Sequence, residues 1–379
     1  MRKKKLCFVS MSFPPEFLGG TNLFHKNLIK YIHSKHKNII VSWVYFGKEN
    51  KRDFKDEVNY IELKVDNFFS SSLFWKGLML NRFFKKNYFD VINARTGFWI
   101  HLYPKKKNQR IVQTFHGTRF YFNKNHYKRL NLIKKTLLLV FLSFNWITDM
   151  PSKKSDKLIC VSEKVKKQVQ KLYGKRKNIV VIRTGVDLKN FKVRNKNKIK
   201  EKLGFDKENS YGLYIGRGGY WTKGLDRAIN LSEEIYKKNK KYRLIVIGSD
   251  LKKVKHLIDK KFVIYVKEVE REKMMLYYNV ADVFFCLSRY EGGSPTLVVS
   301  EAMASGCLLV CSKDSEQEII KDEKNGLIIK EFGKKEAKEI LDILDNKKKK
   351  EEIIKNSTKT IKEISLEKWG ERYLDALMK

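Results

Sequence analysis

Short apolar runs recur along the chain, and each is followed by a polar loop and then by a helical pattern. KLCFVS and RIVQTF are clear examples in the first half, and YRLIVIG and DVFFCLS in the second. Strands that are apolar throughout and alternate with helices are typical of parallel sheets with helices on both faces. The pattern therefore predicts an α/β protein built from doubly wound, Rossmann-like sheets.

The chain length and one polar stretch predict two such domains. A chain of 379 residues exceeds one typical domain. Residues 192–209 are rich in Lys and Asn, hold no candidate strand and fit a linker flank. We expect a first domain over residues 1–190 and a second over residues 205–360. Such sheets bind ligands beyond the carboxyl ends of their strands, so the expected site is the cleft between two facing domains.

The last segment, residues 361–379, is expected to form a helix that packs back on the first domain. Four of its apolar residues share one helical face: Leu366, Trp369, Tyr373 and Leu377. A helix with one such apolar stripe needs a partner surface.

The chain carries a large excess of positive charge. Lys and Arg number 81 against 42 Asp and Glu, which gives a net charge of +39. Such a surface attracts polyanions, among them nucleic acid, anionic lipid and phosphate-rich substrates. The alternative is that biased codon usage accounts for most of the excess, because Asn and Ile are also abundant. The sequence has no helix-turn-helix, RRM or zinc-finger pattern and its basic residues are spread out, which argues against nucleic acid as the partner.

Cysteine use and hydropathy predict a cytoplasmic protein. The five cysteines lie mostly in apolar runs without a CxxC pair, as expected of buried thiols in a reducing compartment. The seven histidines show no zinc-ligand spacing, so we expect no metal. The start, MRKKKLCFVSMSF, fits a first strand better than a signal peptide. No segment has the roughly 20 apolar residues that a membrane span requires.

Two glycine-containing loops follow predicted strands and precede predicted helices. In the first, Gly19 and Gly20 allow a ligand close to the backbone, and the next helix offers unpaired N–H groups. Such a pair also makes an ordinary tight turn. In the second, Arg217 and Lys223 flank a turn directly before a helix. A guanidinium for bidentate contact, an ammonium and backbone donors suit a diphosphate; the alternative is two surface cations in a basic chain.

A third element, DVFFCLSRYEGGSPTLVVSEAMASG, carries an acidic pair beside a helix start. The turn holds Glu291, and the helix is expected to begin near Ser294 or Pro295, since Ser is a frequent N-cap and Pro a frequent first residue. Glu301 lies inside this helix. Two carboxylates placed here would hold sugar hydroxyls by charge-assisted hydrogen bonds. The alternative is one loop acid and one surface acid.

Together these segments resemble the retaining GT-B glycosyltransferases of the large nucleotide-sugar family four, over nearly the whole chain. The matching segments are VIRTGVDLKNF, with Thr184 in place of the family's Asn, QTFHGT and the Gly-Arg…Lys-Gly loop. The resemblance implies that Gly19 and Gly20 lie beside the donor phosphates and the acceptor. It also implies that His116 contacts the donor sugar, where a core histidine is the alternative.

The same resemblance assigns the remaining site residues. It implies that Arg217 and Lys223 are the cations for the diphosphate and that Glu301 binds the ribose hydroxyls. The helix with Trp369 would return to the first domain.

The acidic pair departs from the family's spacing. Nine residues separate Glu291 from Glu301, where the family has seven, and Gly293 occupies the expected position. Either the turn carries a bulge that returns Glu291 to the sugar, or that role is lost; we favour the bulge. A diglycine that often follows CLLVCS in relatives is absent, with Glu318 as a candidate acid there.

The expected reaction is retaining transfer of a hexose-type sugar from a nucleoside diphosphate sugar. Arg217 and Lys223 would stabilise the charge that grows on the leaving diphosphate, together with a helix start, so no metal or other cofactor is expected. That helix start consists of Ser294, Pro295, Thr296 and Leu297. The resemblance implies front-face substitution assisted by the leaving phosphate. The alternatives are an inverting transferase with a general base in the first domain and a basic, non-catalytic protein that binds nucleic acid or membrane.

The expected acceptor is a glycan or lipid-linked molecule in cell-surface polysaccharide or glycolipid synthesis. Residues 68–89 and 119–142 mix aromatic and basic side chains, which suits an interfacial surface on an anionic membrane. This would place the enzyme peripherally on the inner face of the membrane. The alternative is that these residues are core aromatics beside solvated lysines.

Overall fold

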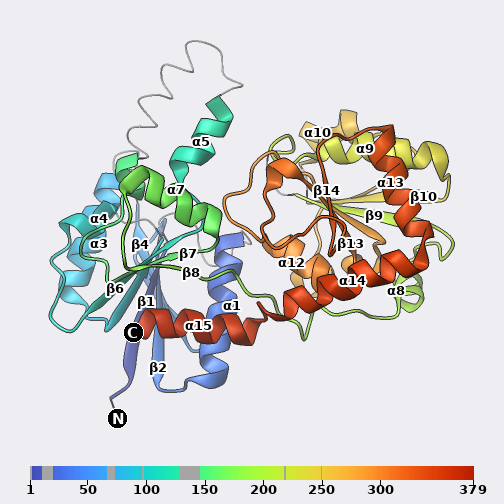
Figure 1. The fold of residues 1–379 in the computed structure, drawn as a ribbon. Coiled ribbons are helices and arrows are strands. Elements are labelled where there is room, and N and C mark those ends of the chain that lie inside the picture. The colour runs from blue at the N-terminus through green and yellow to red at the C-terminus, as the bar shows by residue number, and fades with distance from the viewer. Residues whose placement is uncertain are drawn as a thin grey trace. The chain divides into compact units, whose positions relative to one another are not determined.

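The structure is a computed structural model that describes residues 2–10, 20–65, 73–95, 98–127, 146–216, 219–248 and 250–379. The chain forms two compact units (Figure 1). The first comprises Met1–Arg183 with Leu366–Lys379, and the second comprises Thr184–Ser365. Each unit is a largely parallel sheet with helices on both faces, which confirms the predicted class of two Rossmann-like domains.

The described strands of the first unit form one sheet in the order β3-β4-β2-β1-β5-β6-β7-β8. Every neighbouring pair is parallel except β3 with β4. The strands are β1 (Lys4–Val9), β2 (Ile39–Gly47), β3 (Lys51–Lys55), β4 (Val58–Lys64), β5 (Val91–Ala94), β6 (Arg110–Phe115), β7 (Lys157–Cys160) and β8 (Ile179–Val181).

Helices cover both faces of this sheet because alternate strand residues point to opposite sides. In β1, Leu6 and Phe8 join the core under the first and last helices, whereas Cys7 and Val9 join the core on the other face. The helices are α1 (Gly20–Lys35), α3 (Leu73–Lys86), α4 (Phe98–Leu102), α5 (Arg119–Tyr127), α7 (Glu163–Tyr173) and α15 (Leu366–Met378). All five cysteines of the chain are buried free thiols, as predicted.

The C-terminal helix α15 packs on the first unit, as predicted. Figure 1 shows it in red beside α1. The rings of Trp369 and Tyr373 lie 4.9 and 5.2 Å from that of Phe24, and the Tyr373 hydroxyl hydrogen-bonds to the Thr114 hydroxyl. The helix carries Gly370 where it meets α1, because a Cβ there would lie 2.3 Å from the ring of Tyr31.

The second unit holds a sheet in the order β11-β10-β9-β12-β13-β14, parallel at each described pairing. Its strands are β9 (Ser210–Ile215), β10 (Tyr242–Ile247), β11 (Val263–Val266), β12 (Val283–Cys286), β13 (Leu308–Ser312) and β14 (Leu327–Ile329). Its helices are α8 (Lys196–Lys202), α9 (Leu225–Lys238), α10 (Leu251–Ile258), α11 (Met274–Val280), α12 (Leu297–Ala304), α13 (Lys334–Asp345) and α14 (Lys347–Lys362), with short 3₁₀ turns η1 (Arg271–Lys273) and η2 (Lys313–Ser315).

The polar stretch 192–209, expected as a linker flank, is a folded part of the second unit. It forms α8, which Asn195 caps through the Lys198 N–H, and Ile199 on this helix is buried. The buried ammonium of Lys200 donates to the carbonyls of Lys207 and Asn209 at 2.9 and 2.7 Å. The prediction of a linker flank, which rested on polarity, was therefore wrong. The few apolar and amphipathic side chains of this segment suffice to pack it on the second unit.

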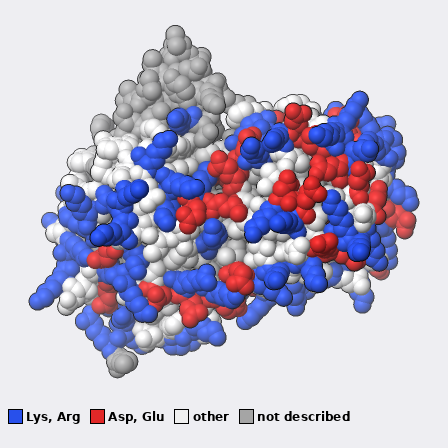
Figure 2. Space-filling model, viewed as in Figure 1, with Lys and Arg blue, Asp and Glu red and all other residues white. Residues whose placement is uncertain are grey.

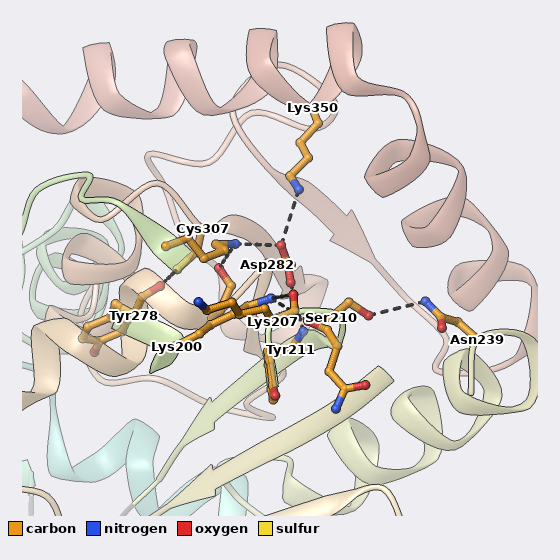
Figure 3. Close-up of polar contacts among 12 residues, drawn as sticks. Lys200, Lys207, Ser210, Tyr211, Asn239, Tyr278, Asp282, Cys307 and Lys350 are labelled. Carbon is orange, nitrogen blue, oxygen red and sulfur yellow. Dashed lines mark hydrogen bonds and ion pairs between the residues drawn. The ribbon is translucent and has the colours of Figure 1, made fainter. Parts of the chain in front are cut away.

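A cluster of charged groups joins α8 to the amino end of the second sheet (Figure 3). The carboxylate of Asp282 accepts from Lys196 Nζ at 2.7 Å and from the Tyr211 N–H at 2.9 Å. Lys350 Nζ of α14 lies 3.5 Å from the same carboxylate. Burial raises the pKa of Asp282, but the two ammonium groups and these hydrogen bonds outweigh it and lower the pKa overall. The cluster lies at the edge opposite the carboxyl ends of the strands and serves the fold.

Candidate functional site

The strand order of the second sheet indicates by itself where a ligand would bind. The chain leaves β9 toward β10 and β11 on one side, and it leaves β12 toward β13 and β14 on the other. Loops that diverge from neighbouring strands leave a crevice at the carboxyl edge, where ligands of doubly wound sheets bind. In this unit that position, called the crevice below, falls between the loop after β9, of which residues 219–224 are described, and residues 287–296, after β12.

The loop after β9 is held against the loop after β12 by Arg289. Its N–H donates to the Thr222 carbonyl at 2.8 Å, and its guanidinium donates to the Trp221 carbonyl at 2.6 Å. The guanidinium also lies 4.3 Å from the Trp221 ring centre and binds both oxygens of Asp226, at 2.8 and 2.6 Å. Sequence reasoning missed Arg289 as a positioning residue, and the only local signal was its place at a strand end.

The loop also requires a glycine directly before α9. Gly224 has φ 74°, a backbone conformation that favours glycine. A Cβ there would lie 2.0 Å from the Leu287 carbonyl oxygen. The chain segments after β9 and β12 therefore touch backbone to backbone at this point.

Two predicted catalytic residues, Lys223 and Glu291, meet in this crevice. The Lys223 ammonium donates to the two Glu291 oxygens at 2.8 and 2.7 Å, and the Ser288 hydroxyl donates to Oε1 at 2.5 Å. Glu291 is buried. Burial lowers the pKa of Lys223, but the charge and hydrogen bonds of Glu291 outweigh it and raise the pKa overall. The pair thus fixes a charged ammonium at the carboxyl edge of the sheet.

The turn before α12 differs in detail from its prediction. The helix begins at Leu297, with Thr296 before it in extended conformation, and not at Ser294 or Pro295. The Ser294 hydroxyl accepts from the Glu318 N–H at 2.7 Å and the Thr296 N–H donates to Gln317 Oε1 at 3.1 Å. Ser294 therefore joins the turn to the segment after β13 and does not cap the helix.

Glu301, in the second turn of α12, is buried in contact with two partners. Arg271 of η1 pairs with Oε1, and the Tyr278 hydroxyl donates to Oε2 at 2.8 Å. The Arg271 guanidinium lies 4.7 Å from the ring centre of Phe191, which closes the VIRTGVDLKNF segment. Glu301 is thus no surface acid, and Arg271 is a second partner that the sequence did not reveal.

The predicted residues Arg217 and Gly19 lie outside the described residues. Gly20 begins α1, and a Cβ built there would meet no atom within 4 Å. The roles predicted for Arg217 as a diphosphate cation and for Gly19 beside a ligand therefore stay predictions.

In the first unit, His116 lies just beyond the carboxyl end of β6. Its ring meets the Phe24 ring edge-on at 4.6 Å, and its Nε2 is buried with no partner among the described residues. Burial, followed by the charges of Arg95 and His25, holds the pKa of His116 well below its usual range. The imidazole is therefore neutral at physiological pH and can accept or donate one hydrogen bond at each nitrogen according to its tautomer.

A buried carboxylate, Asp149, lies beside the turn that follows His116. Its Oδ2 accepts from the Arg119 N–H at the first residue of α5, at 2.5 Å. Burial raises the pKa of Asp149 to about 6, against the opposing effects of the Arg119 N–H and of the Arg119 and Arg95 charges. No motif of the sequence marks Asp149 as a site residue, because it is a single acid among the mixed residues of FNWITDMP.

The described residues hold neither a metal-ligand cluster nor a membrane-spanning helix. In that part of the chain no three His, Cys, Asp or Glu side chains gather as metal ligands would. None of the described helices combines the length and the apolar character needed to span a bilayer.

Both halves of the chain match glycosyltransferase families. Residues 18–190 match the family described as Glycosyltransferase Family 4, and residues 195–360 match Glycosyl transferases group 1. A relative from Methanocaldococcus jannaschii, an uncharacterized glycosyltransferase, is 24% identical over 292 residues, which is 73% of this chain and 71% of that protein.

Solved structures agree over the full length of the chain. WaaG, a glycosyltransferase involved in lipopolysaccharide biosynthesis, matches with a TM-score of 0.77 at 16% identity, covering 98% of this chain and 99% of that one. Anabaena HepE in complex with UDP-glucose matches with a TM-score of 0.69 at 14% identity, covering 98% and 99%. At these identities the likeness establishes the fold, which is the GT-B fold with two Rossmann-like domains.

Proposed function

We propose that this chain, a glycosyltransferase by the match of both its halves, moves a hexose-type sugar from a nucleoside diphosphate sugar to a glycan or lipid-linked acceptor with retention of configuration. The observation that carries the proposal is the Lys223–Glu291 pair in the crevice between β9 and β12. A fixed ammonium at a switch point of the sheet suits a diphosphate. HepE, which shares the fold, binds UDP-glucose.

In this proposal Lys223 stabilises the negative charge that develops on the leaving diphosphate, with Arg217 as the second cation. Preorganised charges contribute most where charge grows in the transition state. Arg289 keeps the Lys223 loop in place, because it binds Trp221, Thr222 and the carboxylate of Asp226. No metal is required for this charge stabilisation, to which the N-terminus of α12 at Leu297 adds.

Glu301 and His116 take the remaining donor contacts. The Glu301 carboxylate, oriented by Arg271 and Tyr278, has lone pairs left for ribose hydroxyls. The neutral His116 imidazole, with its unpartnered Nε2, suits a hydroxyl of the donor sugar. Glu291 binds the donor sugar in place of the acid that the family has two residues further along. It does so from a longer turn and beside Lys223.

Thermal unfolding with UDP, GDP, ADP and CMP tests the donor site. A nucleotide at about a hundredfold its dissociation constant adds about 2.7 kcal/mol of stability, so the matching nucleotide should raise the melting temperature. Lys223→Ala, Arg217→Ala and Glu301→Ala should each lose most of this shift, whereas Lys241→Ala on the exposed surface should keep it. If no nucleotide stabilises the protein, the donor site is refuted.

Retention is tested separately by the anomer of the product, read by NMR immediately after transfer. A specific observation favours inversion as the second candidate: Asp149 is a buried carboxylate with a pKa raised to about 6, as a general base near neutral pH would be. Inverted product, lost with Asp149→Asn, would establish that candidate. Retained product with activity in Asp149→Asn would exclude it.

The acceptor proposal places the enzyme at the inner face of an anionic membrane in cell-surface polysaccharide or glycolipid synthesis. Phe74 and Trp75 on α3 and Phe122 on α5 are exposed aromatics within the two mixed segments, although residues 68–72 and 128–142 lie outside the described residues. Such side chains suit a bilayer interface. Sedimentation with anionic vesicles should carry the protein down, and Phe74→Ser with Trp75→Ser should weaken this more than Val193→Ser. If the wild-type chain does not bind the vesicles, the membrane part of the proposal is refuted.

A nucleic-acid-binding role has less support. On the face shown in Figure 2, Lys and Arg are scattered with Asp and Glu between them, and they form no single basic stripe. Nucleic-acid-binding surfaces gather their cations along a groove or helix.

A further inference from the structure

A cavity lies at the amino ends of the strands of the first sheet, whereas His116 lies at the carboxyl ends. It measures about 480 Å³ and lies between the edge strand β3, the amino ends of β1, β2 and β4, and the chain that links α3 to β5. Because catalytic groups of doubly wound folds gather at the carboxyl ends of the strands, this cavity is separate from the donor-site residues described above.

The walls of the cavity carry uncompensated positive charge. Lys5, Arg52 and Lys86 line it with one acid, Asp53. None of the three cations forms an ion pair in the described part of the chain, and the Arg52 guanidinium has only the Asn87 amide oxygen as a side-chain partner there, at 3.4 Å. Its remaining donors keep the planar arrangement that binds a carboxylate or phosphate at two points.

The same walls carry groups that suit a saccharide ring. Phe54 of β3 is 67% exposed, the most exposed large apolar side chain of the described residues, and it lines the cavity with Tyr60 and Tyr88. Aromatic faces bury the apolar side of a sugar ring while its hydroxyls need partners. The amides of Asn59 and Asn87 line the same cavity. Each donates to one backbone carbonyl, that of Val41 and that of Phe83, which leaves one N–H and oxygen lone pairs of each amide for a ligand.

We infer that this cavity binds an anionic saccharide, one that carries a carboxylate or a phosphate, away from the catalytic site. The choice of a saccharide over another ringed anion rests on the proposed glycosyltransferase function. The site would hold a distant part of an acidic glycan while the end to be extended reaches the reaction centre. Charged residues on an edge strand also prevent strand-to-strand association, but that role needs neither an exposed aromatic ring nor a cavity.

Isothermal titration of the full chain with tetragalacturonate tests the inference, with UDP present in excess to occupy the donor site. The fully methyl-esterified tetrasaccharide is the matched neutral ligand, and glucose 6-phosphate distinguishes a phosphate from a carboxylate. Tetragalacturonate or the sugar phosphate should bind, and the ester should bind at least tenfold more weakly. Absence of binding by both acids, or equal binding of the ester, would overturn the inference.

Variants separate a site from general attraction to a basic protein. Arg52→Gln and Phe54→Ala should each weaken binding about tenfold, and Phe54→Ala does so without any change of charge. Lys51→Gln and Lys55→Gln, on the same exposed strand but outside the cavity, should change it less than twofold. Equal losses in all four variants, or displacement of the saccharide by added UDP, would refute the inference.

The inference and the proposed function fail separately. Arg52→Gln should leave the thermal shift caused by nucleotide unchanged, because this residue lies in the first unit and outside the donor crevice. Melting temperatures of the variants without ligand confirm that β3, an edge strand, has kept its fold.

Discussion

The Lys223 ammonium and the Glu291 carboxylate form an ion pair in the crevice of the second unit. Each oxygen of the carboxylate lies within 2.8 Å of the ammonium, and Ser288 adds a hydrogen bond at 2.5 Å. A buried carboxylate costs free energy unless it is paired and hydrogen-bonded, and Lys223 and Ser288 supply these partners for Glu291. In the proposed function, a bound diphosphate would compete with Glu291 for the ammonium and leave the carboxylate available to hydroxyl groups.

Glu291→Gln should lower the free energy of unfolding by about 2 kcal/mol, the usual size of a hydrogen bond to a charged group. Urea unfolding measures it. Adding Lys223→Met should restore part of the loss, because the lone ammonium is then removed as well. Lys241→Met breaks an exposed pair with Glu208 and should leave the unfolding curve at its wild-type position. If the double variant loses as much as the two single variants combined, the pair is not coupled.

His25 illustrates a buried group that is kept neutral. Its ring lies 5.1 to 5.5 Å from the rings of Phe8, Trp43 and Phe24. Burial, with the charge of Arg95, lowers the pKa of His25 to about 3. The folded chain therefore resists protonation that the unfolded chain accepts below about pH 6.5.

The linkage predicts that the free energy of unfolding decreases as pH falls from about 6.5 to about 3. His25→Phe keeps an aromatic ring in the same cluster and should remove part of this slope. Urea unfolding at pH 4, 5, 6 and 7 gives the slope for each chain. His256→Gln, on the exposed face of α10, should retain the wild-type slope. A His25→Phe slope as steep as that of the wild-type chain would show that His25 does not contribute.

At the scale of elements, the apolar runs predicted most of the strands and the last helix. Leu366, Trp369, Tyr373 and Leu377 were expected on one face, and all four are buried against the first unit. This prediction was confirmed because the apolar residues of an amphipathic helix recur with a period of 3.6 residues, which can be read from the sequence. The predicted start of α12 was wrong, because the Ser294 hydroxyl accepts from the Glu318 N–H and does not cap the helix. No local sequence pattern indicates this contact.

The two site residues that the sequence did not predict, Arg289 and Arg271, were missed for one physical reason. Arg289 pairs with Asp226 across 63 positions, and Arg271 pairs with Glu301 across 30. Which of many cations meets which carboxylate depends on how loops from different strands converge, and that follows from the completed fold. Residue types and spacing therefore predicted Lys223, Glu291 and Glu301 as candidates, but not the two arginines that position them.

The contact between α1 and α15 permits a matched test at Gly370. Gly370→Ala should lower the free energy of unfolding by about 1 to 3 kcal/mol, because its methyl group would overlap the buried ring of Tyr31 and overpacking has costs of this size. Gly333→Ala is the control, since the nearest atom to its Cβ is a flexible Glu336 oxygen at 3.9 Å. Urea unfolding compares the two. An unchanged Gly370→Ala chain would mean that α15 shifts at no cost.

At the scale of the molecule, the chain enters and leaves the second unit at one place. The Val186 N–H donates to the Ile364 carbonyl at 3.1 Å, and Val186 bridges to Ser365. The last residues then complete the core of the first unit, in which Trp369 and Tyr373 are buried. The two ends of the chain thus stabilise one unit, while the second unit has cores of its own.

Removal of residues 366–379 should therefore damage the unit that is distant in sequence and spare the adjacent one. The loss of Trp369 alone is expected to destabilise the first unit by about 3 to 5 kcal/mol, so its transition should fall strongly or disappear in scanning calorimetry. The transition of the second unit should keep its midpoint and its shift with nucleotide, because Thr184–Ser365 remains intact. Trp369→Ala in the full chain should reproduce the effect in milder form. If both transitions moved together, or if the truncated chain lost its nucleotide shift, the two units would have to unfold as one, and the assignment of α15 to the first unit alone would be wrong.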